Sequence, residues 1–589
     1  MHALTLRRLV EQSLVVLLIA FLALSLIYPI ILTIRGGFAA DPTADAGFFT
    51  ADWTLTHVLR VFRDPATLEG LTNAFGIAVG TTVLSALIAI PLALLSARHA
   101  FPFKAAFSAL VLVPLILPPF VGAIGFRAIM GREGMINTLL GTNWDVLGDA
   151  KAWGVIVVQA LHLYPILYLN ATAALANLDP AMNEAAENLG AGPWRRFTRI
   201  TLPLIRPGLF AGGTIVFIWA FTELGTPLMF DYNRVTAVQI FYGLSEVEGS
   251  ARPYALTFVL LAASLAAYAA GKLAFGRRGY AMSTRATRAG SEVPLKGLKG
   301  WAATAFFLLV TVLAVAPHIG VVLMSFSNVG QWYQSVLPKS LTVAHFGVAL
   351  GSDAAFRSIA NSLVYSLLAV VLNVSIGVTV GYLIARTKTV GRSMLDTLCM
   401  MPLAVPGLVM AFGFVAVSLA WPFRGTLDLG LVTLGSPLDG VVSVVGVDPN
   451  PIPLLVLAYA VRRLPYIVRS VVAGLEQTSG EMEEAALNLG ASRMRAIRSV
   501  VLPLILANII AGALLVFSFS MLEVSDSLLL AQKQEDWPIT RAIFAFSNRQ
   551  GDGPYIASAM GVWGMALLTV TLVGASVLLG KKMGAIFRV

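Results

Sequence analysis

Apolar stretches of about 20 residues recur along the whole 589-residue chain, and most of them carry few charges. A helix of that length crosses the roughly 30 Å hydrocarbon layer of a bilayer. Hydrophobic residues make up 57% of the chain and charged residues 12%, which is about half the charged fraction of a soluble domain. A transmembrane barrel would instead show alternating segments of about 10 residues. The sequence therefore predicts an all-α polytopic membrane protein and excludes a soluble fold.

About twelve transmembrane helices are expected. They lie near 10–33, 72–97, 107–130, 152–176, 207–229, 254–275, 300–325, 360–385, 395–420, 452–475, 506–530 and 555–580. The first apolar run is too long for a signal-peptide core, so we expect it to be retained. Lys and Arg concentrate in the loops on the side of the N-terminus, which predicts that both termini lie in the cytoplasm. The same bias explains the formal charge of +10 without nucleic acid.

The chain repeats itself. Seven residues recur 288 positions later: Pro29, His57, Asn73, Arg98, Pro114, Pro118 and Phe126 match Pro317, His345, Asn361, Arg386, Pro402, Pro406 and Phe414. Five more recur 300 positions later: Pro165, Glu184, Gly190, Pro203 and Glu223 match Pro465, Glu484, Gly490, Pro503 and Glu523. The difference predicts a 12-residue insertion in the outer loop around 421–451.

Six spans in each copy give the two halves the same orientation in the membrane. We therefore expect two parallel six-helix repeats, 1–275 and 300–589, with a pathway at their interface. The polar, basic stretch 276–299 is expected to be a cytoplasmic linker between them.

One inner loop in each half, about 177–206 and 477–506, is strongly patterned. The first contains Glu184-Ala185-Ala186, then Gly190, then Pro203; the second contains Glu484-Ala485-Ala486, Gly490 and Pro503 at the same spacing. Local chemistry predicts a short helix in each loop. Asp179-Pro180 suits a helix start, Thr478 and Glu481 have capping-box spacing, and Gly190 and Gly490 suit a left-handed helix end.

This pattern resembles the EAA loop of the permeases of type I, binding-protein-dependent ABC importers. The resemblance covers essentially the whole chain and implies a multi-pass protein of the bacterial cytoplasmic (inner) membrane. It also implies that each short helix is a coupling helix that docks on an ATPase subunit. The implied coupling residues are Glu184, Ala185, Ala186, Gly190, Pro203, Glu484, Ala485, Ala486, Gly490 and Pro503. The alternative is an amphipathic loop helix lying on the membrane, which two loops of identical spacing disfavour.

The chain contains no Gly-x-x-x-x-Gly-Lys-Ser/Thr phosphate loop, so ATP and Mg²⁺ are expected on a separate ATPase. Two loops imply two ATPase copies, and the resemblance implies a solute-binding protein on the outer side. No catalytic arrangement, metal site or cofactor of its own is expected, and the single cysteine, Cys399, excludes an internal disulfide.

Ionisable residues inside spans are costly and point to the pathway. On this ground we expect His162, Glu223, Arg462, Arg463, Glu523 and Asp526 to line or gate the path between the halves, with one of the arginines pairing with Glu523. The alternative is that the arginines reach the inner surface while the glutamates cap helix ends near the outer one.

The fused two-half form looks most like the ferric-iron permeases, which makes ferric iron the first substrate hypothesis. Permeases of similar build handle thiamine, 2-aminoethylphosphonate and phosphorylated small molecules, and these stay open as alternatives. The rival class is a secondary transporter driven by an ion gradient, which can also have twelve spans in parallel halves.

Overall fold

The computed structural model describes residues 2–40, 52–116, 118–145, 147, 151–176, 178–275, 293–428, 433–446 and 448–579. Most of the expected linker, from 276 to 292, lies outside the described residues. The described chain is mainly helical, with two pairs of very short strands.

The elements of the first half follow one another from the N-terminus to Phe275. They are α1 (His2–Leu22), the π-helical turn η1 (Ala23–Ile27), α2 (Tyr28–Phe38), α3 (Thr56–Arg63), α4 (Pro65–Arg98), β1 (His99–Ala100), α5 (Lys104–Leu110), α6 (Val113–Ile116), α7 (Pro119–Met130), α8 (Met135–Leu140), α9 (Lys151–Ala176), α10 (Pro180–Asn188), α11 (Pro193–Arg196), η2 (Phe197–Thr201), α12 (Leu202–Phe221), α13 (Gly225–Met229), α14 (Thr236–Tyr242), η3 (Gly243–Glu246) and α15 (Arg252–Phe275).

The second half repeats this order. Its elements are β2 (Val293–Pro294), α16 (Leu298–Phe326), α17 (Ala344–Gly351), α18 (Asp353–Arg386), α19 (Arg392–Ala404), α20 (Gly407–Ser418), β3 (Thr426–Asp428), β4 (Thr433–Gly435), α21 (Ile452–Gln477), α22 (Glu481–Asn488), α23 (Arg493–Ala496), η4 (Ile497–Val501), α24 (Leu502–Leu504), α25 (Leu506–Met521), α26 (Ser525–Leu530), η5 (Gln534–Asp536), α27 (Ile539–Ser547) and α28 (Gly553–Leu579). β1 pairs in parallel with β2, and β3 pairs antiparallel with β4 inside the expected insertion.

Eight described helices are long and apolar enough to cross a membrane, and eleven if three bent helix pairs each count as one span. The chain is thus a multi-pass membrane protein. The helix α21, which we expected to span, is not among these candidates, and it carries Arg462, Arg463 and Arg469. Three arginines within one helix are costly to place in a bilayer unless they face a cavity or an acidic partner.

The third and fifth spans differ from the continuous helices that the sequence suggested. The third span of the second half bends by 106° between α19 and α20, and the first half breaks at the equivalent Pro118. Pro406 causes the bend because a proline cannot donate its backbone nitrogen and holds the preceding residue extended. The fifth spans end at Phe221 and Met521, several residues before the expected 229 and 530.

Each half has a three-helix centre, in which α4 packs on α9 and α12, and α18 packs on α21 and α25. The first span of each half also crosses to the other half, since α2 packs on α20 and α16 packs on α7. Glycine permits both crossings. An added Cβ at Gly125 would run into the Pro317 carbonyl, and one at Gly413 would lie 2.8 Å from the Pro29 Cβ. The two halves are therefore interlocked through equivalent helix pairs.

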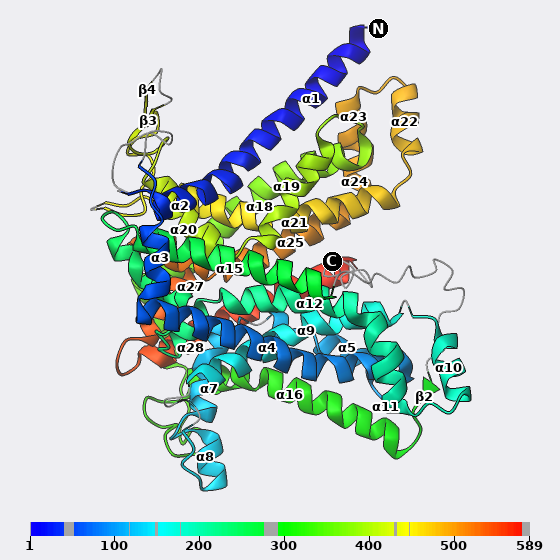
Figure 1. The fold of residues 1–589 in the computed structure, drawn as a ribbon, viewed down its shortest axis with the longest axis vertical. Coiled ribbons are helices and arrows are strands. Elements are labelled where there is room, and N and C mark those ends of the chain that lie inside the picture. The colour runs from blue at the N-terminus through cyan, green and yellow to red at the C-terminus, as the bar shows by residue number, and fades with distance from the viewer. Residues whose placement is uncertain are drawn as a thin grey trace.

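Figure 1 shows that the short helices α10 and α11 of the first half and α22 and α23 of the second project from the same end of the molecule. The helices α3 and α27 and the β3–β4 pair lie at the opposite end. This placement agrees with parallel halves, since equivalent loops emerge on one side.

Candidate coupling and translocation sites

The helix α10 forms where the sequence predicts it. The Asp179 Oδ1 accepts a hydrogen bond from the Ala181 backbone nitrogen at 2.9 Å, and Pro180 is the first helical residue. The chain leaves the helix through Gly190 at φ +80°, a conformation that favours glycine. Glu184, Ala185 and Ala186 lie within this helix, and Pro203 is the second residue of α12.

The helix α22 matches α10 but starts differently, and the predicted capping box is wrong. The Thr478 hydroxyl donates to the Gly474 carbonyl at 3.0 Å, because α21 continues to Gln477 and Thr478 completes its last turn. The Ser479 Oγ instead accepts from the Glu481 backbone nitrogen at 3.2 Å.

The rest of the second loop follows the prediction. Glu484, Ala485 and Ala486 lie in α22, and Pro503 lies in α24. Gly490 has φ +87°, which confirms the left-handed helix end.

The two loops expose the same apolar positions. Met182, Leu189 and Trp194 of the first loop are exposed, and so are Met482, Leu489 and Met494, which follow 300 positions later. Leu189 and Leu489 are 88% and 90% exposed, and Figure 1 places both loops at one end of the molecule. Exposed apolar groups that recur in a matched pair indicate contact surfaces. These side chains were not predicted from the sequence, although their spacing in the repeat could have identified them.

A compact ion cluster lies inside the second half. The Arg462 Nη1 is 2.5 Å from the Glu523 Oε1 and 3.0 Å from the Asp526 Oδ2. Arg463 pairs with the other oxygen of Glu523 and donates to the Phe519 carbonyl at 3.1 Å. Glu523 and Asp526 are 6% and 0% exposed, so these charges neutralise one another away from solvent. The predicted pairing of an arginine with Glu523 is present for both arginines.

Neighbouring groups hold this cluster in place. The break between α25 and α26 leaves the Glu523 carbonyl outside a regular helix, and the hydroxyls of Ser527 and Thr540 donate to it at 2.5 and 2.7 Å. The Tyr459 hydroxyl lies 2.6 Å from the Ser527 Oγ. Gly407 has no side chain where the Arg462 guanidinium lies, so an added Cβ there would overlap it.

The equivalent region of the first half carries a different chemistry. His162 takes the place of Arg462, and its Nδ1 lies 2.6 Å from the Pro114 carbonyl. Glu223 takes the place of Glu523 and accepts from the backbone nitrogen of Thr226 at 3.3 Å, as a cap of α13. Within the described part of the chain, Glu223 makes no ion pair.

The structure therefore brings together four of the six expected pathway residues, Arg462, Arg463, Glu523 and Asp526. His162 contacts the segment before Pro118 instead. The turn that carries Glu223 does approach the turn that carries Glu523, since an added Cβ at Gly225 would lie 2.9 Å from a methyl group of Val524. Glu223 accepts a hydrogen bond at the start of α13, as the alternative of helix-capping glutamates expects. Arg462 and Arg463 do not fit that alternative, because they pair with acids.

The comparison with known families agrees with the repeat. The profile of the family described as "Binding-protein-dependent transport system inner membrane component" matches residues 89–277 and again 377–580, together more than half of the chain. The chain belongs to this family. It is thus the permease component of an ABC importer in the inner membrane, with one family unit in each half, and this favours an ATP-driven importer over an ion-gradient carrier.

Three relatives align over 80–90% of this chain, so each alignment includes parts of both halves. The permease is 26% identical to a putative ferric transport system permease protein of Haemophilus influenzae, over 80% of this chain and 72% of that protein. It is 25% identical to a ferric transport system permease protein of Actinobacillus pleuropneumoniae, over 86% of this chain and 70% of that protein. A Fe(3+)-transport system permease protein of Haemophilus influenzae is 24% identical over 90% of this chain and 92% of its own length.

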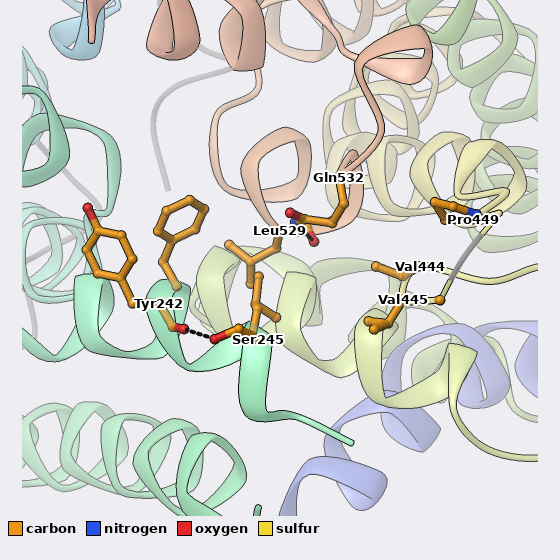
Figure 2. A pocket seen from close by; sticks show the side chains of 10 residues that line it. Tyr242, Ser245, Val444, Val445, Pro449, Leu529 and Gln532 are labelled. Atoms are coloured by element: carbon orange, nitrogen blue, oxygen red, sulfur yellow. Dashed lines mark hydrogen bonds between the residues drawn. The ribbon is translucent and has the colours of Figure 1, made fainter. Parts of the chain in front are cut away.

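The permease also has a cavity of about 350 Å³ at the end opposite to α10 and α22, shown in Figure 2. Tyr242 and Ser245 line it from the first half, and the Ser245 hydroxyl donates to the Tyr242 carbonyl at 3.0 Å. The expected insertion contributes Val444 and Val445, and Gln532 follows α26. Both halves thus form this cavity.

Proposed function

We propose that this chain is the complete pore of an importer for ferric iron, served by a solute-binding protein outside and by two copies of a separate ATPase inside. Its similarity to ferric permeases over 80–90% of its length is the observation that carries the substrate assignment. The proposal assigns ATP and Mg²⁺ to the ATPase, and the permease itself performs no reaction.

The ATPase surface is proposed to consist of α10 and α22. Their matched exposed groups, Leu189 and Leu489 in particular, support one docking site in each half. Apolar groups surrounded by charged ones are typical of such protein contacts. The helices would transmit ATPase closure to α12 and α25 through the π-helical turns η2 and η4 that follow them.

The pathway is proposed to run between the halves, past the turns of Glu223 and Glu523. In the described state Arg462 and Arg463 are neutralised by acidic partners, so they offer no unbalanced positive charge to an anion. Glu223 makes no ion pair among the described residues, and its carboxyl oxygens are of the type that coordinates a hard cation. This charge arrangement favours iron over 2-aminoethylphosphonate or another phosphorylated molecule, and thiamine, a cation, stays the second candidate.

The first experiment is co-purification of the tagged permease with its candidate ATPase, followed by ATPase assays in nanodiscs. We expect two ATPase copies per chain. Glu184→Arg and Glu484→Arg are expected to weaken binding of the ATPase or uncouple it. The matched control is Asp353→Arg, a charge reversal on an exposed residue at the far end of α18.

Transport then tests the substrate. Proteoliposomes that contain the permease and ATPase would receive binding protein loaded with ferric iron, 2-aminoethylphosphonate or thiamine. ATP-dependent accumulation of iron alone supports the proposal. Accumulation of another solute would overturn the iron assignment, and transport driven by a proton or sodium gradient without ATPase would overturn the importer proposal.

A further inference from the structure

A side-chain cluster joins the second coupling helix to two membrane-spanning helices. The Tyr382 hydroxyl, on α18, donates to the Glu483 Oε1 of α22 at 2.5 Å. Arg493, at the start of α23, donates from Nε and Nη2 to the same hydroxyl oxygen at 2.9 and 2.7 Å. Its Nη1 lies 3.0 Å from the Glu11 Oε1 of α1. One guanidinium thus connects three separate segments of the chain.

The cluster is shielded from solvent and lies on the packing face of α1. The side chains of Arg493, Glu11 and Glu483 are 23%, 16% and 10% exposed. Glu11 precedes the buried residues Val15 and Leu18 by one and two turns, so it shares the face with which α1 packs on α18 and α19. Partial burial strengthens such charge-assisted hydrogen bonds.

The first half has no chemistry for an equivalent cluster. The residues that correspond to Glu11, Tyr382, Glu483 and Arg493 are Lys299, Leu94, Asn183 and Pro193. Lys299 is exposed, and neither Leu94 nor Pro193 can provide a side-chain hydrogen bond. The first coupling loop instead has one internal ion pair, in which the Arg196 Nη1 is 2.5 Å from the Glu187 Oε2. The repeat therefore retains both coupling helices but joins only the second to α1 in this way.

The helix α1 belongs to the first half, which makes this connection a link between halves. At the other end of the same span, the Tyr28 hydroxyl donates to the Trp421 carbonyl of the second half at 2.6 Å. Between these points the π-helical turn η1 separates α1 from α2, and α2 packs on both α15 and α20. A displacement of α22 that pulls Arg493 would therefore act on a helix that extends across the membrane.

We propose that Arg493 is a positioning residue that fastens the second coupling helix to the first span, so that the two coupling loops are unequal. Motion of α22 passes through Tyr382 to its own half and through Glu11 to the first half. Motion of α10 has no such cross-connection among the described residues. This inference rests on the proposed coupling function.

The first test measures the connection in the permease alone, without ATPase. Hydrogen exchange of peptides covering 481–499 and 181–199 would be compared between the parent chain and Arg493→Gln in nanodiscs. We expect exchange in 481–499 to rise about tenfold, with no change in 181–199. Glu11→Gln should also raise hydrogen exchange in 481–499. The double variant should exchange little faster than either single variant, because both substitutions break one network.

The second test measures coupling in the full complex with the binding protein. Arg493→Gln is expected to lower solute transported per ATP hydrolysed about tenfold while ATPase binding persists. Arg493→Lys keeps the charge but has one nitrogen in place of the three that reach Tyr382 and Glu11, so it should fall between the parent chain and Arg493→Gln. Arg196→Gln, which removes the ion pair of the first loop, is the matched control and should change the ratio less than twofold.

The two tests separate the possible failures. Unchanged exchange in Arg493→Gln would overturn the proposed connection. Raised exchange with an unchanged transport ratio would assign the cluster to loop stability alone and overturn the positioning role. An equal loss in Arg196→Gln would overturn the inequality of the two loops. A parent complex that performs no ATP-dependent transport would instead contradict the proposed function, while the exchange comparison would still report on the connection.

Discussion

The interiors of the two halves differ at positions that the repeat makes equivalent. The second half places Arg462 and Arg463 against Glu523 and Asp526, whereas the first half has His162 and a Glu223 that caps a short helix. Both halves keep the helix break that presents the glutamate. The two halves thus share a backbone fold but differ in their charged side chains. Ion pairs stabilise the second half around Glu523, whereas the equivalent Glu223 of the first half makes none among the described residues.

The sharpest test of this contrast is Arg462→Ala against His162→Ala. Removal of Arg462 leaves Asp526 without its ion pair and Glu523 with only one, and breaking such buried pairs costs about 3–5 kcal/mol. Loss of the contact between His162 and the Pro114 carbonyl should cost about 1 kcal/mol. Thermal unfolding in nanodiscs would measure both, and equal effects would contradict the different roles of the two halves.

Substitution of the two glutamates should show a smaller contrast. Glu523→Gln removes the charge that faces both arginines, and we expect it to cost about 2–3 kcal/mol, as for hydrogen bonds to charged groups. Glu223→Gln keeps an acceptor for the Thr226 backbone nitrogen and should cost less than about 0.5 kcal/mol.

Transport separates the roles of these two positions further. If Glu223 faces the solute, Glu223→Gln should lower uptake while unfolding stays unchanged. Normal uptake in both variants with normal ATPase coupling would remove both glutamates from the pathway.

Several features were predictable because they depend on nearby residues. The Asp179 cap and the turns at Gly190 and Gly490 follow from local backbone chemistry. The two matched loops were visible because the repeat preserves their spacing. Thr478 shows the limit even here, since α21 ends at Gln477, two residues beyond the expected 475, and this was enough to take the Thr478 hydroxyl away from α22.

The remaining features depend on contacts between distant segments. Glu11 meets Arg493 only because α1 packs on the second half, and no pattern near either residue records this. The pairing of both arginines with Glu523 likewise requires the fold of α21 against α25. The bend at Pro406 was missed because hydropathy continues across it, although the proline itself was visible.

The two helix pairs that cross between the halves, α7 on α16 and α2 on α20, differ in how closely they pack. Gly125 approaches the backbone of α16, whereas the first atom that Gly413 meets is the ring carbon of Pro29. The Pro29 ring cannot move apart from its backbone, but the overlap at Gly413 is smaller than at Gly125, since the added Cβ would lie 2.8 Å from the Pro29 Cβ and 3.1 Å from the Pro29 backbone. Gly125→Ala should therefore cost about 2 kcal/mol and Gly413→Ala about 1 kcal/mol. Thermal unfolding of the two variants would test the order, and a reversed order would contradict the tighter packing of α7 on α16.

The smallest expected effect concerns the cavity of Figure 2, beside which the second half has an exposed ion pair. The Lys533 Nζ lies 2.8 Å from the Asp448 Oδ1, and these residues adjoin Gln532 and Pro449 of the cavity wall. The hydrogen bond from Lys533 lowers the pKa of Asp448 below its ordinary value of 3.8. The first half has Asn233 in place of Lys533, and its ion pair in this region joins Lys151 and Asp231 instead, with 3.5 Å between Nζ and Oδ2.

Because the pKa of Asp448 is lowered in the folded chain, the pair contributes fully above pH 3.8 and loses its contribution as the pH falls through the lowered value. Exchange in 441–450, corrected for the intrinsic pH dependence, should therefore stay constant from about pH 5 to 8 and rise about twofold in strong acid. Lys533→Met should show the raised exchange at neutral pH already and lose the acid step. An acid step that survives in Lys533→Met would assign the pH dependence to another carboxylate, and the cavity wall would then be independent of this ion pair.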